Sequence, residues 1–215
     1  MQRYFREPVS GFLHLGGAVA SLGGLTYLVS LTWDWTARLV SIAVYGASLV
    51  LLFLSSTVYH LTQARPAVIN VLRKLDHSAI YVLIAGTYTP FCLIAFQGFF
   101  RWGLLGLIWA IALVGIVMKI ILGRLPRWVN AGVYVIMGWL CVLAIPQMAS
   151  SLPTQALAWL IVGGMVYTLG AVVYATKVFN FFPGKFGFHE IWHIFVLAGA
   201  LAHFLSVRSL IIPPG

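Results

Sequence analysis

Long apolar runs, separated by short polar stretches, are the feature that most constrains this chain. Seven runs can be read, at roughly 11–31, 38–61, 77–97, 103–122, 129–147, 155–176 and 188–211. A helix needs about 20 apolar residues to cross the hydrocarbon core of a bilayer, and each run is close to that length. Because the connections are short, we predict an all-α, polytopic membrane protein, a seven-transmembrane helix bundle forming a single domain over residues 1–215.

Composition supports this assignment. Of the 215 residues, 61% are hydrophobic and 8% are charged, which is too few charges to cover the surface of a soluble domain. The cationic residues are scattered singly between the apolar runs, so we expect no nucleic-acid partner. Cys92 and Cys141 lie inside apolar runs and form neither a disulfide framework nor a Cys-rich zinc motif.

Lysine and arginine residues at the span ends predict the orientation, because cytoplasmic loops carry an excess of them. Ten lie on the side of the N-terminus: Arg3, Arg6, Arg65, Arg73, Lys74, Lys119, Arg124, Arg127, Lys177 and Lys185. Three lie on the other side: Arg38, Arg101 and Arg208. We therefore expect the N-terminus in the cytoplasm, the C-terminus outside, and a multi-pass protein of the cell (plasma or inner) membrane.

The first apolar run also has features of a signal peptide. Arg3 and Arg6 precede it, and it reaches the small-residue sequence AVA at 18–20. The run continues to Leu31, however, so we expect it to be the first spanning helix.

Ionisable side chains in spanning helices are costly, and they usually face the bundle interior and serve a function. By the run boundaries, His60 closes the second span, while Asp76 and His77 open the third. The sequence HEIWH opens the seventh span with His189, Glu190 and His193. In a helix, His189 and His193 are one turn apart and within about 40° of each other, so both rings can face one point. The three span ends belong to the same side of the membrane.

Three imidazoles with one open position form the ligand set of a catalytic zinc ion. His60, His189 and His193 fit this set. Asp76 could accept a proton from zinc-bound water, and Ser56, one turn before His60, could orient a ligand or donate to a developing oxyanion. Spacing alone leaves open the alternative that a histidine at a span end is an interfacial residue.

HEIWH also matches H-E-x-x-H, in which the glutamate is the general base of a metalloprotease. An intramembrane protease needs a third ligand, but no Asp or Glu follows Glu190. His203 is the only later candidate, and it would lie about 21 Å further along the helix. The protease is therefore the weaker hypothesis.

Three blocks of the sequence resemble the signatures of a known family. They are SSTVYH (55–60), LDHSAIYVLIAGTYTPF (75–91) and HEIWHIFVLAGALAHF (189–204). They are similar to the hemolysin III family, the bacterial branch of the progestin and adipoQ receptor superfamily, which includes the adiponectin receptors. The resemblance implies a seven-helix bundle with a cytoplasmic N-terminus and zinc held by three histidines near the cytoplasmic leaflet. It makes His60, His189 and His193 the zinc ligands, and it matches Ser56 and Asp76 to the serine and the aspartate of the family's signature blocks.

The resemblance leaves other polar residues without a role. The family pattern does not require Glu190, so its match to the protease motif looks incidental. Near the N-terminus the family shows an acidic residue, an Asn and then His-Gly, where this chain has Glu7, Ser10 and His14-Leu15-Gly16. No role is assigned to His14 on this basis, and His77 and His203 are expected to be structural.

Three functions compete. The first is a zinc-dependent hydrolase of lipid amides or esters, similar to a ceramidase, with a membrane lipid as substrate and a role in lipid homeostasis. The alternative is a non-enzymatic sensor or regulator of membrane lipid state, in which zinc links the second and seventh spans. A cytolytic pore, suggested by the family name, is less favoured because no span shows a continuous polar stripe.

Overall fold

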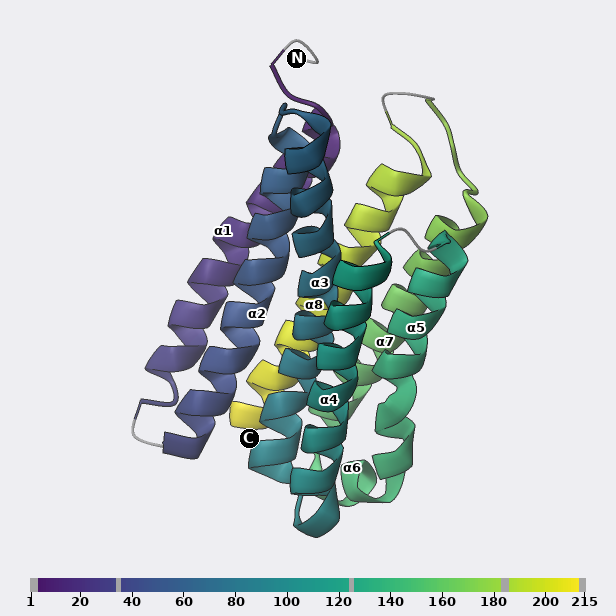
Figure 1. Cartoon of the computed structure of the whole chain (residues 1–215). Helices are drawn as coiled ribbons and strands as arrows, with labels where there is room; N and C mark the ends of the chain where they lie inside the picture. Colours follow the sequence, from purple (N-terminus) through teal and green to yellow (C-terminus); the bar gives the residue numbers. More distant parts are fainter. Residues whose placement is uncertain (1–3, 34–35, 124–125, 183–185, 213–215) are drawn as a thin grey trace.

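The computed structural model describes residues 4–33, 36–123, 126–182 and 186–212. Within these ranges, seven helical spans are long and apolar enough to cross a membrane, which confirms the predicted number. The helices are α1 (Pro8–Ser30), α2 (Thr36–Leu61), α3 (Pro66–Pro90), α4 (Gly98–Leu122), α5 (Arg127–Trp139), α6 (Ile145–Ser151), α7 (Thr154–Thr176) and α8 (Phe188–Ile211). The termini lie at opposite ends of the bundle (Figure 1). Arg3, Asp34, Arg124 and Lys185 lie outside the described residues.

Two of the seven spans are composite. A π-helical turn, Phe91–Ala95, continues α3, and a 3₁₀ turn, Leu140–Ala144, joins α5 to α6. The break between α5 and α6 is held by Tyr88 of α3. Its hydroxyl lies 3.0 Å from the carbonyl oxygen of Met137 and 2.8 Å from that of Gly138, and it accepts a hydrogen bond of 2.8 Å from the N–H of Cys141. The backbone groups that the break frees therefore have a partner, as a lipid environment requires.

Helices α2, α3 and α8 form the centre of the bundle. In their most apolar 18-residue windows, 50%, 56% and 56% of the residues are buried, against 22–28% in the other four spans. Helix α8 packs against both α1 and α7, and α2 packs between α1 and α3. The approach of α1 is close because glycine leaves room: Gly17 faces Phe53 of α2 and Leu197 of α8. The polar residues of the predicted site thus lie on the most buried helices.

The third span begins earlier than the sequence predicted. Helix α3 starts at Pro66, eleven residues before the expected start at 77. The expectation that Asp76 and His77 open this span is therefore wrong. They lie within the helix, about 15 Å from its first residue. Asp76 is consequently buried among neighbouring helices and is not a residue of the loop.

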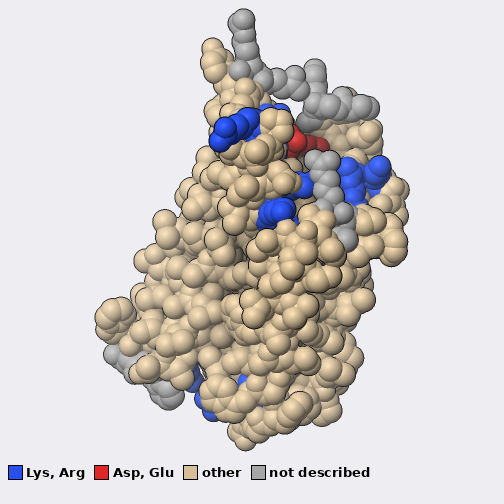
Figure 2. Space-filling view, in the orientation of Figure 1, with Lys and Arg blue, Asp and Glu red and all other residues tan. Residues whose placement is uncertain are grey.

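Lysine and arginine side chains gather at the end of the bundle that carries the N-terminus, and few lie at the opposite end (Figure 2). The described residues at the N-terminal end are Arg6, Arg65, Arg73, Lys74, Lys119, Arg127 and Lys177. This asymmetry agrees with the pattern from which the orientation was predicted.

Candidate metal centre

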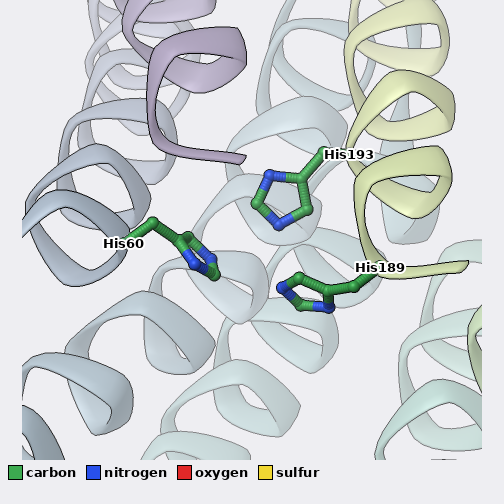
Figure 3. Close-up of side chains that lie close together, drawn as sticks. All are labelled: His60, His189 and His193. Atoms are coloured by element: carbon green, nitrogen blue, oxygen red, sulfur yellow. The ribbon is translucent and has the colours of Figure 1, made fainter. Parts of the chain in front are cut away.

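Three histidines from two helices converge near the N-terminal end of the bundle. His60 lies in the last turn of α2, and His189 and His193 lie in the first two turns of α8. The three rings turn toward a common point (Figure 3). Each ring offers one nitrogen, and these three nitrogens lie within 4.8 Å of one another. The predicted juxtaposition of His60 with His189 and His193 is therefore present, and the cluster could hold a metal ion.

The dimensions of a zinc site are smaller than the limit found for this cluster. Two nitrogens bound to one tetrahedral zinc ion at about 2.0–2.1 Å are about 3.3 Å apart. Nitrogens at the limit of 4.8 Å would have to approach each other by about 1.5 Å to bind one zinc ion. His60 and His193 are almost fully buried, with exposed fractions of 1% and 2%. Imidazole nitrogens suit zinc and also other transition metals, so the residues fit a metal without identifying it.

Glu7 orients the ring of His60. The carboxylate of Glu7 accepts a hydrogen bond from Nδ1 of His60, which leaves Nε2 of that ring free for a metal. The backbone strengthens this pairing, because the N–H of Glu7 donates to the carbonyl oxygen of His60 at 2.9 Å. Burial alone would raise the pKa of Glu7, but the hydrogen bond to His60 and the nearby positive charge of Arg6 outweigh burial and lower it. A carboxylate that holds the far nitrogen of a ligating histidine is the usual support of a metal site.

His14 of α1 belongs to the same buried cluster. Its ring stacks on that of His193, with centroids 3.9 Å apart and planes at 19°. Its Nδ1 forms a hydrogen bond of 2.7 Å with the hydroxyl of Ser56. Nε2 of His14 and Nδ1 of His193 are buried without a hydrogen-bond partner in the part of the chain that the structure describes. Unpaired polar atoms in a buried site are rare, and they point to a missing ligand or water.

Glu190 has a structural role in this geometry. It is the third residue of α8, and its carboxylate accepts a hydrogen bond of 2.8 Å from the N–H of Gly187 that precedes the helix. The other carboxylate oxygen accepts a hydrogen bond of 3.1 Å from the hydroxyl of Ser10. Glu190 thus stabilises the start of α8 and connects it to α1.

An apolar cavity of about 530 Å³ opens beside the histidines. Ser56, Asp76, His189 and His193 are among its lining residues, and most of the others are aliphatic or aromatic. Asp76 is buried, and its carboxylate lies 4.0 Å from Nε2 of His77. The structure therefore brings both predicted polar residues, Ser56 and Asp76, into the lining of the cavity that His189 and His193 also line.

His203 lies apart from the cluster, deeper along α8. Its Nδ1 is 2.9 Å from the carbonyl oxygen of Gly199, one turn earlier in its own helix. The ring packs against Tyr167 with centroids 5.2 Å apart, and it occupies the space that a side chain at Gly163 would need. His203 is thus absent from the metal cluster and is not the later ligand that the protease hypothesis would need.

Sequence reasoning missed the contribution of α1. Glu7, Ser10 and His14 recur at intervals of three and four residues, which places them on one helical face. That polar stripe on an otherwise apolar helix was the available signal. Because no metal-binding motif contains it, its relation to the histidines became visible only in the packed structure.

Comparison with known proteins assigns the chain to a family. Residues 2–204 match the family model described as "Haemolysin-III related". The chain is 37% identical to Hemolysin-3 of Bacillus cereus, over 99% of this chain and 95% of that protein. It is also 37% identical to the Hemolysin-3 homolog of Bacillus subtilis (strain 168), over 94% of this chain and 92% of that protein. A more distant relative, the adiponectin receptor protein of Drosophila melanogaster, is 26% identical over 97% of this chain and 51% of its own length. The chain therefore belongs to the hemolysin III family.

Proposed function

We propose that the protein is a zinc-dependent hydrolase of lipid amides or esters in the cell membrane, with His60, His189 and His193 as metal ligands. The observation that carries this proposal is that two of the three clustered histidines, His189 and His193, line a large apolar cavity. A volume of about 530 Å³ and a mainly apolar lining are typical of a site for a small ligand with an apolar body. The lining does not suit an aqueous pore.

Entry from the membrane is the route that suits a lipid chain. Two of the lining residues, Ile145 of α6 and Ile161 of α7, are 53% and 54% exposed. A chain can therefore enter between these helices while its polar group remains near the histidines. Entry from the bilayer spares an apolar substrate transfer through water.

His60, His189 and His193 would hold the zinc ion, which when bound would lower the pKa of a water molecule to about 7 and polarise a carbonyl group. Asp76 takes the proton of the attacking water and passes it to the nitrogen or oxygen that leaves when the acyl bond breaks. Ser56, held by His14, donates a hydrogen bond to the carbonyl oxygen as it gains negative charge. The products are a fatty acid and an amine or alcohol.

The test combines metal analysis with a hydrolysis assay on the purified full-length protein. We expect about one zinc per chain, loss of metal in His60→Ala and His193→Ala, and release of fatty acid from a panel of lipid amides and esters. Asp76→Asn should abolish release while the metal stays bound. If protein with full zinc occupancy releases no fatty acid, the hydrolase proposal fails. A cellular phenotype that survives Asp76→Asn would favour the alternative, a lipid sensor in which the metal links α2 to α8.

A further inference from the structure

A second cavity, of about 560 Å³, lies beside the metal centre, and its lining is more polar than that of the first. Three cationic side chains line it, and they come from three helices: Arg73 of α3, Lys119 of α4 and Arg127 of α5. This cavity and the apolar cavity share the lining residues His77, Asn130, Tyr174 and His189. The two cavities are therefore adjacent, and they meet at the metal centre.

The cations of this cavity have only uncharged partners. Lys119 is 3% exposed, and its Nζ donates to Oδ1 of Asn130 at 3.2 Å. Arg73 donates to Oδ1 of Asn70 at 2.6 Å, and the guanidinium of Arg127 lies 5.0 Å from the ring centre of Phe188. Over the described ranges, none of these three cations forms an ion pair with a carboxylate. Burying an ammonium group without a countercharge is costly, so a bound anion would stabilise Lys119.

The carboxylates that line the cavity form hydrogen bonds and ion pairs with groups other than these three cations. Glu7 binds His60 and Arg6, and Glu190 binds Ser10 and the N–H of Gly187. Asp76 is close enough to attract Lys119 electrostatically, but it lines the apolar cavity and forms no ion pair with that lysine. The wall formed by α3, α4 and α5 therefore remains positively charged.

The asymmetry of charge across the membrane does not by itself account for this arrangement. Cations that set orientation need only lie near the span ends, exposed to water or headgroups. Lys74 and Lys177 behave in this way: Lys74 donates to the exposed carbonyl oxygen of Ile120 at 2.7 Å, and Lys177 is exposed. Lys119 is instead buried in a cavity wall and is close enough to Arg73 for their charges to repel.

We propose that this cavity binds a phosphate-type oxyanion, which Lys119, Arg73 and Arg127 recognise. Ammonium and guanidinium groups suit phosphate oxygens, with which they form charge-assisted hydrogen bonds. The anion comes from a lipid headgroup or from free phosphate. If the anion is a lipid headgroup, this inference rests on the proposed function and specifies the substrate class of the hydrolase. The substrate is then a lipid phosphate whose chain occupies the apolar cavity and whose acyl bond lies at the metal centre.

The experiment measures binding without turnover, with full-length protein in dodecyl maltoside, a detergent that contains no phosphate. Dioleoyl phosphatidic acid is titrated against dioleoylglycerol, which has the same chains and no phosphate, and inorganic phosphate is added as a competitor. The variants are Lys119→Met and Arg73→Gln. Lys74→Met is the matched control, since it removes a lysine charge from the same end of the bundle outside the cavity.

We expect phosphatidic acid to bind more tightly than dioleoylglycerol, and Lys119→Met and Arg73→Gln each to weaken its binding by about tenfold. Lys74→Met should change the affinity by less than about twofold. Competition by millimolar inorganic phosphate would identify a site for the free anion, and binding of phosphatidic acid without such competition would identify the headgroup. Equal binding of both lipids, or equal effects of Lys74→Met and Lys119→Met, would overturn the proposal. Repeating the titration with His193→Ala separates it from the hydrolase proposal, because anion binding should survive loss of the metal.

Discussion

Glu7 contacts the candidate metal centre although it is not one of the predicted ligands. Its carboxylate fixes which nitrogen of His60 carries the proton, so the ring is oriented before a metal binds. We expect Glu7→Gln to weaken zinc binding by about tenfold to a hundredfold, as other changes to the partners of metal-bound histidines do. The measurement is a competitive zinc titration of the purified protein. An unchanged affinity would show that the pairing with His60 does not support the site.

Glu190 offers the matched comparison, because it is also a carboxylate near the cluster and its partners are Ser10 and Gly187. We expect Glu190→Gln to leave zinc affinity within about threefold and to cost about 1 kcal/mol of stability, as the loss of a helix cap does. Ser10→Ala should cost a similar amount, since it removes one of the same hydrogen bonds. Loss of all hydrolysis in Glu190→Gln, with the metal retained, would indicate that Glu190 acts as a general base and would contradict the structural role.

At the scale of elements, the break between α5 and α6 depends on one hydroxyl group from another helix. Tyr88→Phe would leave the N–H of Cys141 without its partner in an apolar layer. We expect the free energy of unfolding to fall by about 1–3 kcal/mol, the cost of a buried unsatisfied group. Tyr81→Phe is the control, because this tyrosine is also buried in α3 and no hydrogen bond of its hydroxyl is found among the described residues. Equal destabilisation by both variants would contradict the role of Tyr88.

Hydropathy predicted the seven spans because crossing a bilayer demands length and apolarity from every helix. It placed the start of the third span too late, since Asn70, Arg73 and Lys74 interrupt the apolar pattern at the beginning of α3. Pro66 was the better signal, because proline is favoured at the first position of a helix. The 3₁₀ break at Leu140–Ala144 has no comparable local signal beyond Pro146, because its partner Tyr88 is distant in sequence.

The residues of the candidate site were also only partly predictable from the sequence. The pair His189 and His193 was predictable from helical spacing alone, whereas the approach of His60 depends on how α2 packs near α8. The common side of the span ends suggested that pairing, and the resemblance to the hemolysin III family supported it. Glu7 and His14 were given no role, because they act through contacts between helices and this chain departs from the family's N-terminal pattern. Local periodicity therefore predicts the residues of one helix, and packing decides which helices meet.

For the whole molecule, the charge asymmetry predicts how the bundle is oriented in the membrane. Seven described cations lie at the end with the N-terminus, against Arg38, Arg101 and Arg208 at the other end. An odd number of spans then puts the C-terminus on the opposite side of the membrane. We expect the N-terminal end, with the histidine cluster and the cationic cavity, to face the cytoplasm.

A reporter fused to the C-terminus tests this orientation in living cells. Alkaline phosphatase, which is active only outside the cytoplasm, should be active there, while green fluorescent protein exported unfolded at the same position should remain dark. Fusions in the connection between α2 and α3 should give the reverse pattern, because that connection lies at the cationic end of the bundle. Fluorescence from the C-terminal fusion would instead place the cationic end outside. The anion held by Lys119 would then have to come from outside the cell, so the experiment also decides which pool of phosphate can reach the second cavity.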